Sequence, residues 1–407
     1  MTRALFLIFG IAAVAAGAAQ TPSPNPPLFL YAAVGPELST YRVSALDGSL
    51  RQTSSVTLPF AVQYVWHHPS TRFLYAAWSN GMQGDRHGIT AYRVDTATGA
   101  LEAHGRAIEI RHRPVHLTLD ADATHVLVAY NNPSSLSVHD VNPDFTLGAE
   151  VKQPEPLDGG IYAHQIRVHP SNRMVVMVTR GNGPVPNRPE DPGALKIYNY
   201  RNGIVTNRQS IAPNGGFGYQ PRHVDFHPTL PFMYVNLERQ NQLQVYRTVN
   251  GESVEPQALY TKDTLDNQAA SKPAQMTGAI HVHPNGRFVY ISNRASGTMM
   301  ADGKAVWEGG ENTIGVYAIE QKTGEPVRIQ NVDSGGMHAR TFTLDSASAL
   351  LVAANQNTVT RADGTRVPAS LAVFRIADNG KLGLLRKYDV DSGQGASLMW
   401  TGFVRRK

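Results

Sequence analysis

The chain of 407 residues contains no cysteine. This excludes a disulfide framework, a thiolate zinc site, an iron–sulfur cluster and a cysteine nucleophile. Charged residues are also few, at 17% of the chain against 42% hydrophobic residues, a balance typical of a globular protein with a large core. The formal net charge is only +5, and the longest basic run is the terminal Arg405-Arg406-Lys407. Nucleic-acid binding therefore has little electrostatic support, whereas a basic pocket for a small acidic molecule stays open.

Long hydrophobic runs are missing except near the N-terminus. There, Arg3 precedes an apolar stretch, residues 4–14, and the small residues 15–19. This order is typical of an export signal, and the stretch is shorter than the roughly 20 apolar residues of a transmembrane helix. We therefore predict a signal peptide over residues 1–19, a proline-rich linker over residues 20–27, and a periplasmic or secreted protein with no stable membrane anchor after cleavage. An uncleaved N-terminal anchor is the alternative.

The remaining sequence repeats one unit seven times. Each copy has a β-type run followed by a turn, and the runs contain an aromatic residue or histidine at Tyr41, Tyr92, His139, Tyr198, Tyr246, Tyr317 and Phe374. Glycine in six of the turns, as in Asn202-Gly203, suits the positive φ of tight hairpins. A further pair of strands precedes six of the copies, as in "VDFHPTLPFMYVNLER" and "IHVHPNGRFVYISNRA".

The first copy keeps only one strand of that pair, "LFLYAAVG", and an isolated β-type run, "SLMWTGFV", lies near the other end of the chain. Pairing of these two runs would close a ring and remove its unpaired edge. We therefore predict an all-β fold, a single seven-bladed β-propeller of four-stranded blades over residues 28–407, closed by its terminal strands. Three glycine- and proline-rich insertions, residues 181–193, 297–311 and 357–370, are expected to wall one mouth of the channel.

Connectivity places two positions of each blade at one face. The first strand of a blade runs to the "HP" turn, and the second strand runs back from it. The start of the first strand and the end of the second strand therefore lie together at the face opposite the turn. Both positions are counted from the turn proline or its equivalent, and most of their residues are polar. The position six residues before it holds Gln63, Val115, His164, Arg222, Gly278 and Arg340. The position ten residues after it holds Ser79, Asn131, Arg180, Glu238, Arg294 and Gln356. Four arginines against one glutamate predict a cationic funnel that suits a carboxylate or phosphate.

The blade "GYQPRHVDFHPTLPFMYVNLERQNQLQVY" and the following "HVHPNGRFVYISNR" resemble the seven-bladed propeller lactonases, the family of bacterial 6-phosphogluconolactonases and fungal carboxymuconate cycloisomerases. The similarity covers about residues 28–404. The segments "ARTFTLD", with Arg340, and "AANQ", with Gln356, are similar to segments of the family's last full blade. The resemblance implies that the family's active-site His, Arg, Glu and Arg correspond to His164, Arg222, Glu238 and Arg294.

We therefore expect a lactonase, a carboxylic-ester hydrolase that acts on a sugar-type acidic lactone of the 6-phosphogluconolactone kind, with no metal or other cofactor. Arg222 and Arg294 would hold the acidic group and the carbonyl oxygen as negative charge develops. His164 would activate water as a general base, with Glu238 orienting it or handling the second proton. The remaining predicted pocket residues are Gln63, Arg180, His223, Arg340 and Gln356.

Other interpretations stay open. The same residues would suit a carboxymuconate-type cycloisomerase, in which His164 or Glu238 moves a proton to or from carbon. A secreted propeller could also be a binding platform without catalysis, and Glu238 could belong to a purely structural ion pair. The particular lactone and the oligomeric state are likewise open. The histidines before the turn prolines are expected to form turn or strand-end hydrogen bonds: His68, His169, His227 and His283.

Overall fold

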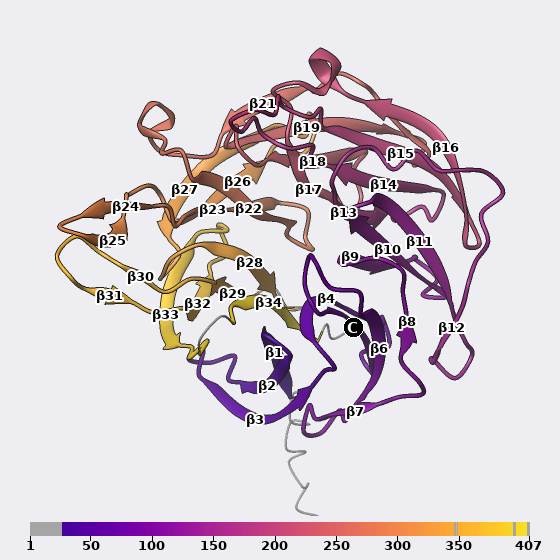
Figure 1. Cartoon of the computed structure of the whole chain (residues 1–407), viewed down its shortest axis with the longest axis horizontal. Coiled ribbons are helices and arrows are strands. Elements are labelled where there is room, and N and C mark those ends of the chain that lie inside the picture. Colours follow the sequence, from indigo (N-terminus) through magenta and orange to yellow (C-terminus); the bar gives the residue numbers. More distant parts are fainter. Residues whose placement is uncertain (1–26, 346, 348, 394–395, 405–407) are drawn as a thin grey trace, which may run out of the picture.

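The computed structural model of the chain describes residues 27–404, except residues 346, 348, 394 and 395. The predicted signal peptide and residues 20–26 of the predicted linker lie outside this part. Seven sheets surround a central axis (Figure 1), and the predicted all-β, seven-bladed propeller is confirmed. None of the helices in the described part is long and apolar enough to cross a membrane.

Blades 2 to 4 follow one another along the chain, each beginning with its axial strand. Blade 2 has β4 (Ala61–His67), β5 (Phe73–Ser79), β6 (His87–Val94) and the short β7 (Leu101–Ala103) and β8 (Ile108–Glu109). Blade 3 has β9 (Pro114–Leu119), β10 (His125–Asn131), β11 (Ser134–Val141) and β12 (Leu147–Glu150). Blade 4 has β13 (Ala163–Val168), β14 (Met174–Thr179), β15 (Ala194–Arg201) and β16 (Ile204–Ile211), followed by the short helix η1 (Pro213–Gly216).

Blades 5 to 7 repeat this order. Blade 5 has β17 (Pro221–Phe226), β18 (Phe232–Leu237) and β19 (Gln242–Val249), with β20 (Ser253–Val254) and β21 (Tyr260–Asp263) paired to β19 and the short helix η2 (Gln268–Ala270) after them. Blade 6 has β22 (Gln275–Val282), β23 (Phe288–Ala295), β26 (Thr313–Ile319) and β27 (Pro326–Asp333). Blade 7 has β28 (Ala339–Leu344), β29 (Leu350–Asn355), β32 (Ser370–Ile376) and β33 (Leu382–Asp389).

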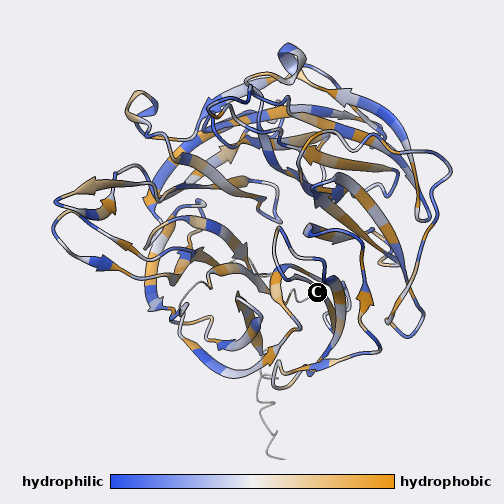
Figure 2. Cartoon of the chain, viewed as in Figure 1, coloured by the Kyte–Doolittle hydropathy of each residue, from blue (hydrophilic) through white to orange (hydrophobic). Residues whose placement is uncertain are grey.

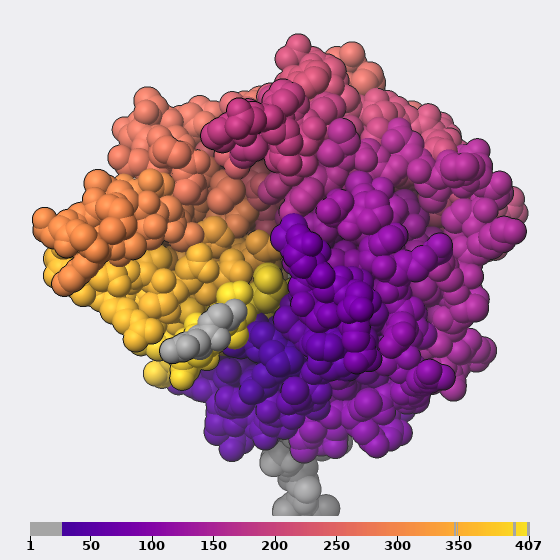
Figure 3. All heavy atoms as spheres, in the orientation of Figure 1, coloured from indigo at the N-terminus to yellow at the C-terminus, as the bar shows by residue number. Residues whose placement is uncertain are grey.

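Blade 1 joins the two ends of the chain. Its order is β3 (Leu50–Thr57), β2 (Glu37–Val43), β1 (Leu28–Val34) and β34 (Leu398–Phe403), the last at the axis. The antiparallel register sets Leu30 opposite Phe403 and Ala32 opposite Thr401. The first and last parts of the chain consequently lie side by side in the space-filling view (Figure 3), and the predicted ring closure is confirmed.

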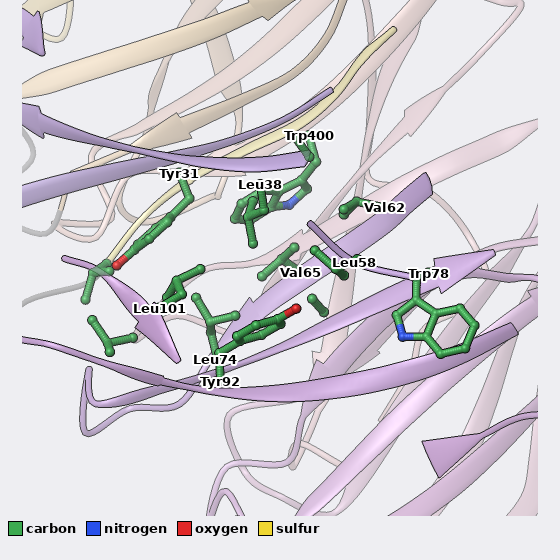
Figure 4. Packing of buried hydrophobic residues seen from close by; sticks show 14 of the residues in the cluster. Tyr31, Leu38, Leu58, Val62, Val65, Leu74, Trp78, Tyr92, Leu101 and Trp400 are labelled. Carbon is green, nitrogen blue, oxygen red and sulfur yellow. The ribbon is translucent and has the colours of Figure 1, made fainter. Parts of the chain in front are cut away.

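The hydrophobic core lies between the blades. Seven clusters of buried apolar side chains each join two neighbouring blades, and the cluster between blades 1 and 2 includes Tyr31, Val65, Trp78 and Trp400 (Figure 4). Hydrophobic segments accordingly recur along the strands of the whole ring (Figure 2). Each blade therefore buries both faces and depends on two neighbours for its core.

Tyrosine hydroxyls add polar links across several blade interfaces. Tyr31 Oη donates to the carbonyl oxygen of Gly99 at 2.8 Å, and the same bond recurs from Tyr234 to Gly324 and from Tyr290 to Gly380, each at 2.9 Å. Each bond runs from the second strand of one blade to the hairpin tip of the next. These bonds satisfy carbonyl groups that would otherwise be buried without a partner.

Two of the three insertions form small hairpins. β24 (Thr298–Ala301) pairs with β25 (Lys304–Trp307), β30 (Val359–Thr360) pairs with β31 (Arg366–Val367), and the two hairpins contact each other. Figure 1 shows both at the left edge of the ring instead of over its centre. For these two insertions, the expected position around the channel mouth is therefore wrong.

The histidines before the turn prolines cap their turns, as the sequence predicts. In each turn the imidazole Nδ1 accepts a backbone N–H two residues further on, at 3.0 to 3.2 Å, in His68, His169, His227 and His283. His227 makes two further bonds. Its Nδ1 accepts the N–H of Leu230 at 2.9 Å, and its Nε2 donates to the carbonyl of Gly286 in the next blade at 2.8 Å.

Replacing His227 by alanine should lower the free energy of unfolding by about 2 kcal/mol, because the side chain is buried and its loss removes three hydrogen bonds and leaves the N–H groups of Thr229 and Leu230 without their acceptor. His68→Ala is the matched control in a more exposed turn. It should lower the free energy of unfolding by less than about 1 kcal/mol. Urea unfolding of both variants measures the difference. Equal losses would contradict a specific cap at His227.

Candidate active site

The residues that begin the axial strands lie on β-bulges. In five blades one residue is skipped by the register between the axial strand and its neighbour: Gln63, Val115, His164, Arg222 and Arg340. In blade 6 the irregularity covers Gly278 and Ala279, and in blade 1 it falls on Met399. A bulge re-aims its side chain, and bulges are enriched beside active sites. The residue six positions before the turn proline is therefore the bulged residue of its axial strand. Met399 is the bulged residue of the seventh axial strand, and the counting missed it.

Glu238 is the centre of a buried polar cluster. It directly follows β18 and is 1% exposed. Its Oε1 accepts hydrogen bonds from Arg222 Nε at 3.0 Å and from Arg294 Nη2 at 2.5 Å. Its Oε2 accepts a bond from Arg180 Nη1 at 2.7 Å. Three blades thus bring together four of the residues that the sequence singles out.

The charge of Glu238 is fixed by its surroundings. Burial raises the pKa of this carboxyl, but the charges of Arg294, Arg180 and Arg222 outweigh burial and hold its pKa at about 2. The carboxylate therefore stays ionised at neutral pH. It can orient the guanidinium groups and balance part of their charge, but it cannot donate a proton there.

The two most buried arginines are held in place by further bonds. Arg222 Nη1 donates to the carbonyl of Gly278 at 2.5 Å, and Arg294 Nε donates to the carbonyl of Thr277 at 3.0 Å. Both carbonyls belong to the irregular start of β22. The bulge of blade 6 therefore supplies the acceptors that fix the orientation of the guanidinium planes.

His338 and Ser296 extend this arrangement, and sequence reasoning missed both. Arg294 Nη1 donates to His338 Nε2 at 2.6 Å, so the ring proton lies on Nδ1, which donates to Ser296 Oγ at 2.8 Å. Burial and the charge of Arg294 lower the pKa of His338 well below its usual value, so the ring is neutral. The position of His338 two residues before Arg340 is the one signal that pointed to it.

His164 lies beside the same arginines. Burial lowers its pKa well below 6.5, and the charges of Arg222, Arg340 and Arg180 lower it further. Its Nδ1 has no hydrogen-bond partner among the described residues. A neutral imidazole with an unpaired nitrogen can accept a proton or bind a polar substrate atom.

Further cationic groups surround this cluster. Burial and the charge of Arg294 lower the pKa of Arg340 to about 10, and Arg113, which sequence reasoning missed, adds a second repulsive charge. The guanidinium carbon of Arg180 lies 4.5 Å from the centre of the Tyr162 ring. Five arginines against Glu238 give these six side chains a net charge of +4, that is, five minus one. Such a site attracts anions.

The other predicted pocket residues divide into two groups. His223 adjoins the cluster, since its ring nitrogens lie 3.3 Å from Arg222 Nη1. The two glutamines bond elsewhere: Gln63 donates to the carbonyl of Ala61 at 3.0 Å, and Gln356 donates to Ser397 Oγ at 3.2 Å. The structure thus gathers His164, Arg180, Arg222, His223, Glu238, Arg294 and Arg340 around one cluster.

Comparison with known proteins finds relatives over most of the chain. The chain is 28% identical to the 6-phosphogluconolactonase of Bacillus subtilis over 310 residues, 72% of this chain and 77% of that protein. It is 26% identical to the 6-phosphogluconolactonase of Pectobacterium carotovorum over 360 residues, 88% of this chain and 92% of that protein.

Solved structures show the same fold. The periplasmic gluconolactonase of Pseudomonas aeruginosa matches with a TM-score of 0.68 at 19% identity, over 91% of this chain and 99% of that one. A family model described as "Lactonase, 7-bladed beta-propeller" matches residues 30–362, well over half of the sequence. The chain therefore belongs to the seven-bladed β-propeller lactonase family.

Proposed function

We propose that the chain hydrolyses a sugar-type lactone that carries an acidic group, of the 6-phosphogluconolactone kind. The observation that carries the proposal is the convergence of Arg180, Arg222 and Arg294 on the buried Glu238, beside the neutral His164. The curated relatives named 6-phosphogluconolactonase support the same reaction class. The cationic surroundings support an anionic substrate.

The arginines can stabilise the charge that develops during hydrolysis. A guanidinium has five N–H donors, and the described bonds of Arg294 use three of them, to Glu238, Thr277 and His338. The other donors of Arg294 and Arg222 are available for the carbonyl oxygen of the lactone as it becomes an oxyanion. Because Glu238 holds these groups before substrate arrives, little reorganisation is needed in the transition state.

His164 supplies the base. Its nitrogen accepts a proton from water as the water oxygen bonds to the carbonyl carbon, and it returns that proton to the ring oxygen as the carbon–oxygen bond of the lactone breaks. In the free protein, the nearby arginines oppose the imidazolium form. The negative charge of the substrate and of the oxyanion offsets this repulsion, so proton transfer becomes favourable when an anion is bound. We assign Glu238 an orienting and electrostatic role.

Export forms part of the proposal. The residue pattern of positions 1–19 indicates a cleavable signal. The structurally similar gluconolactonase of Pseudomonas aeruginosa is periplasmic. We therefore propose that a single propeller, residues 28–407, acts in the periplasm or outside the cell.

Lactone hydrolysis by the purified chain tests the proposal. A pH-indicator assay should compare 6-phosphogluconolactone, a uronic-acid lactone and neutral gluconolactone, with and without EDTA. We expect the acidic lactones to react with a kcat/KM at least about tenfold above that of the neutral one, because the site holds excess positive charge. EDTA should leave the rates unchanged. No turnover of any lactone by the folded protein would contradict the proposal and favour a cycloisomerase or a binding platform.

Glu238→Gln should reduce both stability and activity. The substitution leaves three guanidinium groups, the buried ones of Arg222 and Arg294 and the half-buried one of Arg180, without their counter-charge, which should lower the free energy of unfolding by about 3–5 kcal/mol. Loss of the arginine orientation should lower kcat/KM by at least about 100-fold. Glu109→Gln is the control, because that side chain is exposed and pairs with Arg86 at 3.6 Å. If the Glu238→Gln variant kept full activity, the orienting role would be wrong.

The pH dependence should report His164. Because its pKa in the free protein lies well below 6.5, kcat/KM should be flat between about pH 6 and about pH 8 and should fall only in more acidic solution, as protonation removes the base. His164→Asn should lower kcat/KM by about 100- to 10,000-fold and abolish the acidic limb. His104→Asn, at a partly buried histidine of blade 2 outside the arginine cluster, should change neither the rate nor the acidic limb. A limb that persists in His164→Asn would assign the base elsewhere.

A further inference from the structure

The axial channel contains a cavity that the proposed reaction does not use. It has a volume of about 350 Å³, within the range of small-molecule sites. His223 lines it and also contacts Arg222, so the cavity lies directly beyond the arginine cluster. The lining also includes His68 and the exposed Pro69 of a turn. The cavity therefore opens at the turn face, opposite the proposed active site.

Aromatic side chains form much of the wall. Tyr64 and Trp66 come from β4, Trp400 comes from β34, and Phe342 comes from β28. The ring centre of Tyr64 lies 6.4 Å from that of Trp66 and 6.3 Å from that of Trp400. Planar aromatic molecules pack well against such walls, through stacked or edge-to-face contacts.

A small residue leaves room between these rings. Ala279 lies on the opposite side of the channel in β22, at a position where blade 5 carries the larger His223. Gly402, two residues after Trp400 on β34, makes space for the Trp400 ring itself, because a Cβ there would lie 2.4 Å from that ring. The cavity therefore depends on Ala279 of blade 6, and its Trp400 wall depends on Gly402.

The charged groups of this wall are already paired. Arg167 Nη2 donates to Asp225 Oδ1 at 2.9 Å, and its guanidinium carbon lies 5.2 Å from the centre of the Trp66 ring. His281 Nδ1 lies 3.8 Å from Asp225 Oδ2. Burial lowers the pKa of His223 well below its usual value, so that ring is neutral. Unlike the arginine cluster, this end of the channel has one arginine in its described lining, Arg167, and Asp225 behind the wall balances its charge.

One polar atom of the wall needs a partner. Thr341 Oγ1 is buried, the residue is 8% exposed, and the hydroxyl has no hydrogen-bond partner among the described residues. A buried hydroxyl without a partner is costly, and a hydroxyl or carbonyl group on a bound molecule would satisfy it. Thr341 lines the cavity, and a change of its side-chain rotamer would turn the buried hydroxyl toward a bound molecule.

We propose that this cavity is a second ligand site, which binds a neutral, planar aromatic molecule with one hydroxyl or carbonyl group. The aromatic walls hold the ring, Thr341 bonds to the polar group, and the paired charges disfavour an ion. This site goes beyond the lactonase function and does not depend on it, because its binding is measured without turnover.

Isothermal titration calorimetry with 2-naphthol tests the proposal directly. The probe has two fused rings and one hydroxyl group, and we expect it to bind the wild-type chain with a Kd below about 1 mM. The anion 2-naphthoate, with the same rings, should bind at least about tenfold more weakly because no unpaired cation meets its carboxylate. Glucose should not bind in this range. Tighter binding of glucose or 2-naphthoate than of 2-naphthol would overturn the proposal.

Two variants locate the binding. Thr341→Val keeps the shape of the side chain and should weaken 2-naphthol binding by about tenfold, since it removes one hydrogen bond. Ala279→Leu should fill the cavity and abolish binding, while circular dichroism checks that the propeller remains folded. Trp307→Phe is the control, because Trp307 lies in the hairpin β24–β25 at the edge of the ring. The absence of binding to the wild type, or unchanged binding in both cavity variants, would overturn the assignment.

Discussion

Every blade of this propeller packs between two neighbours, and this condition is met only because β34 pairs with β1. The hydrophobic clusters are shared between adjacent blades, so an open ring would leave two apolar faces and a strand edge exposed to water. Closure also decides where the axial strands begin. Their starts converge at one mouth of the channel, and only this convergence brings residues from three blades to a single carboxylate.

The convergence creates an electrostatic problem that Glu238 partly solves. The bulges turn Arg222 and Arg340 toward a region that Arg294 also occupies, and like charges at this distance would repel each other. One buried carboxylate cannot neutralise them all. Burial and then the uncompensated charge lower the pKa of His164, and the same charge attracts an anion to the site. The repulsion between these arginines thus destabilises the fold, whereas the proposed catalysis needs their positive charge.

Much of this arrangement could be predicted because it follows from repetition. The ring closure, the turn histidines and the proximity of Arg180, Arg222, Glu238 and Arg294 all follow from the position of a residue within its blade. The bulges themselves could not be predicted, because a register shift depends on both paired strands. Their presence nevertheless explains why the counted positions point into the channel.

Other features depended on contacts that the repeat does not encode. His338 and Arg113 lie near the cluster because neighbouring blades bring them there, and neither stands at one of the two counted positions of its blade. Gln63 and Gln356 occupy the counted positions, but their amides find partners closer by. The aromatic cavity joins Trp66 to Trp400, residues near opposite ends of the chain.

The pairing of β1 with β34 makes the order of the blades in the sequence arbitrary with respect to the fold. The first and last described strands are hydrogen-bonded neighbours, so a short linker could join the start of β1 to the end of β34. New ends could then be opened in a loop such as residues 104–107, between β7 and β8, without removing a strand pair from the ring. Such a circular permutant should keep the same fold, because the ring depends on which strands are neighbours and not on which strand comes first in the chain.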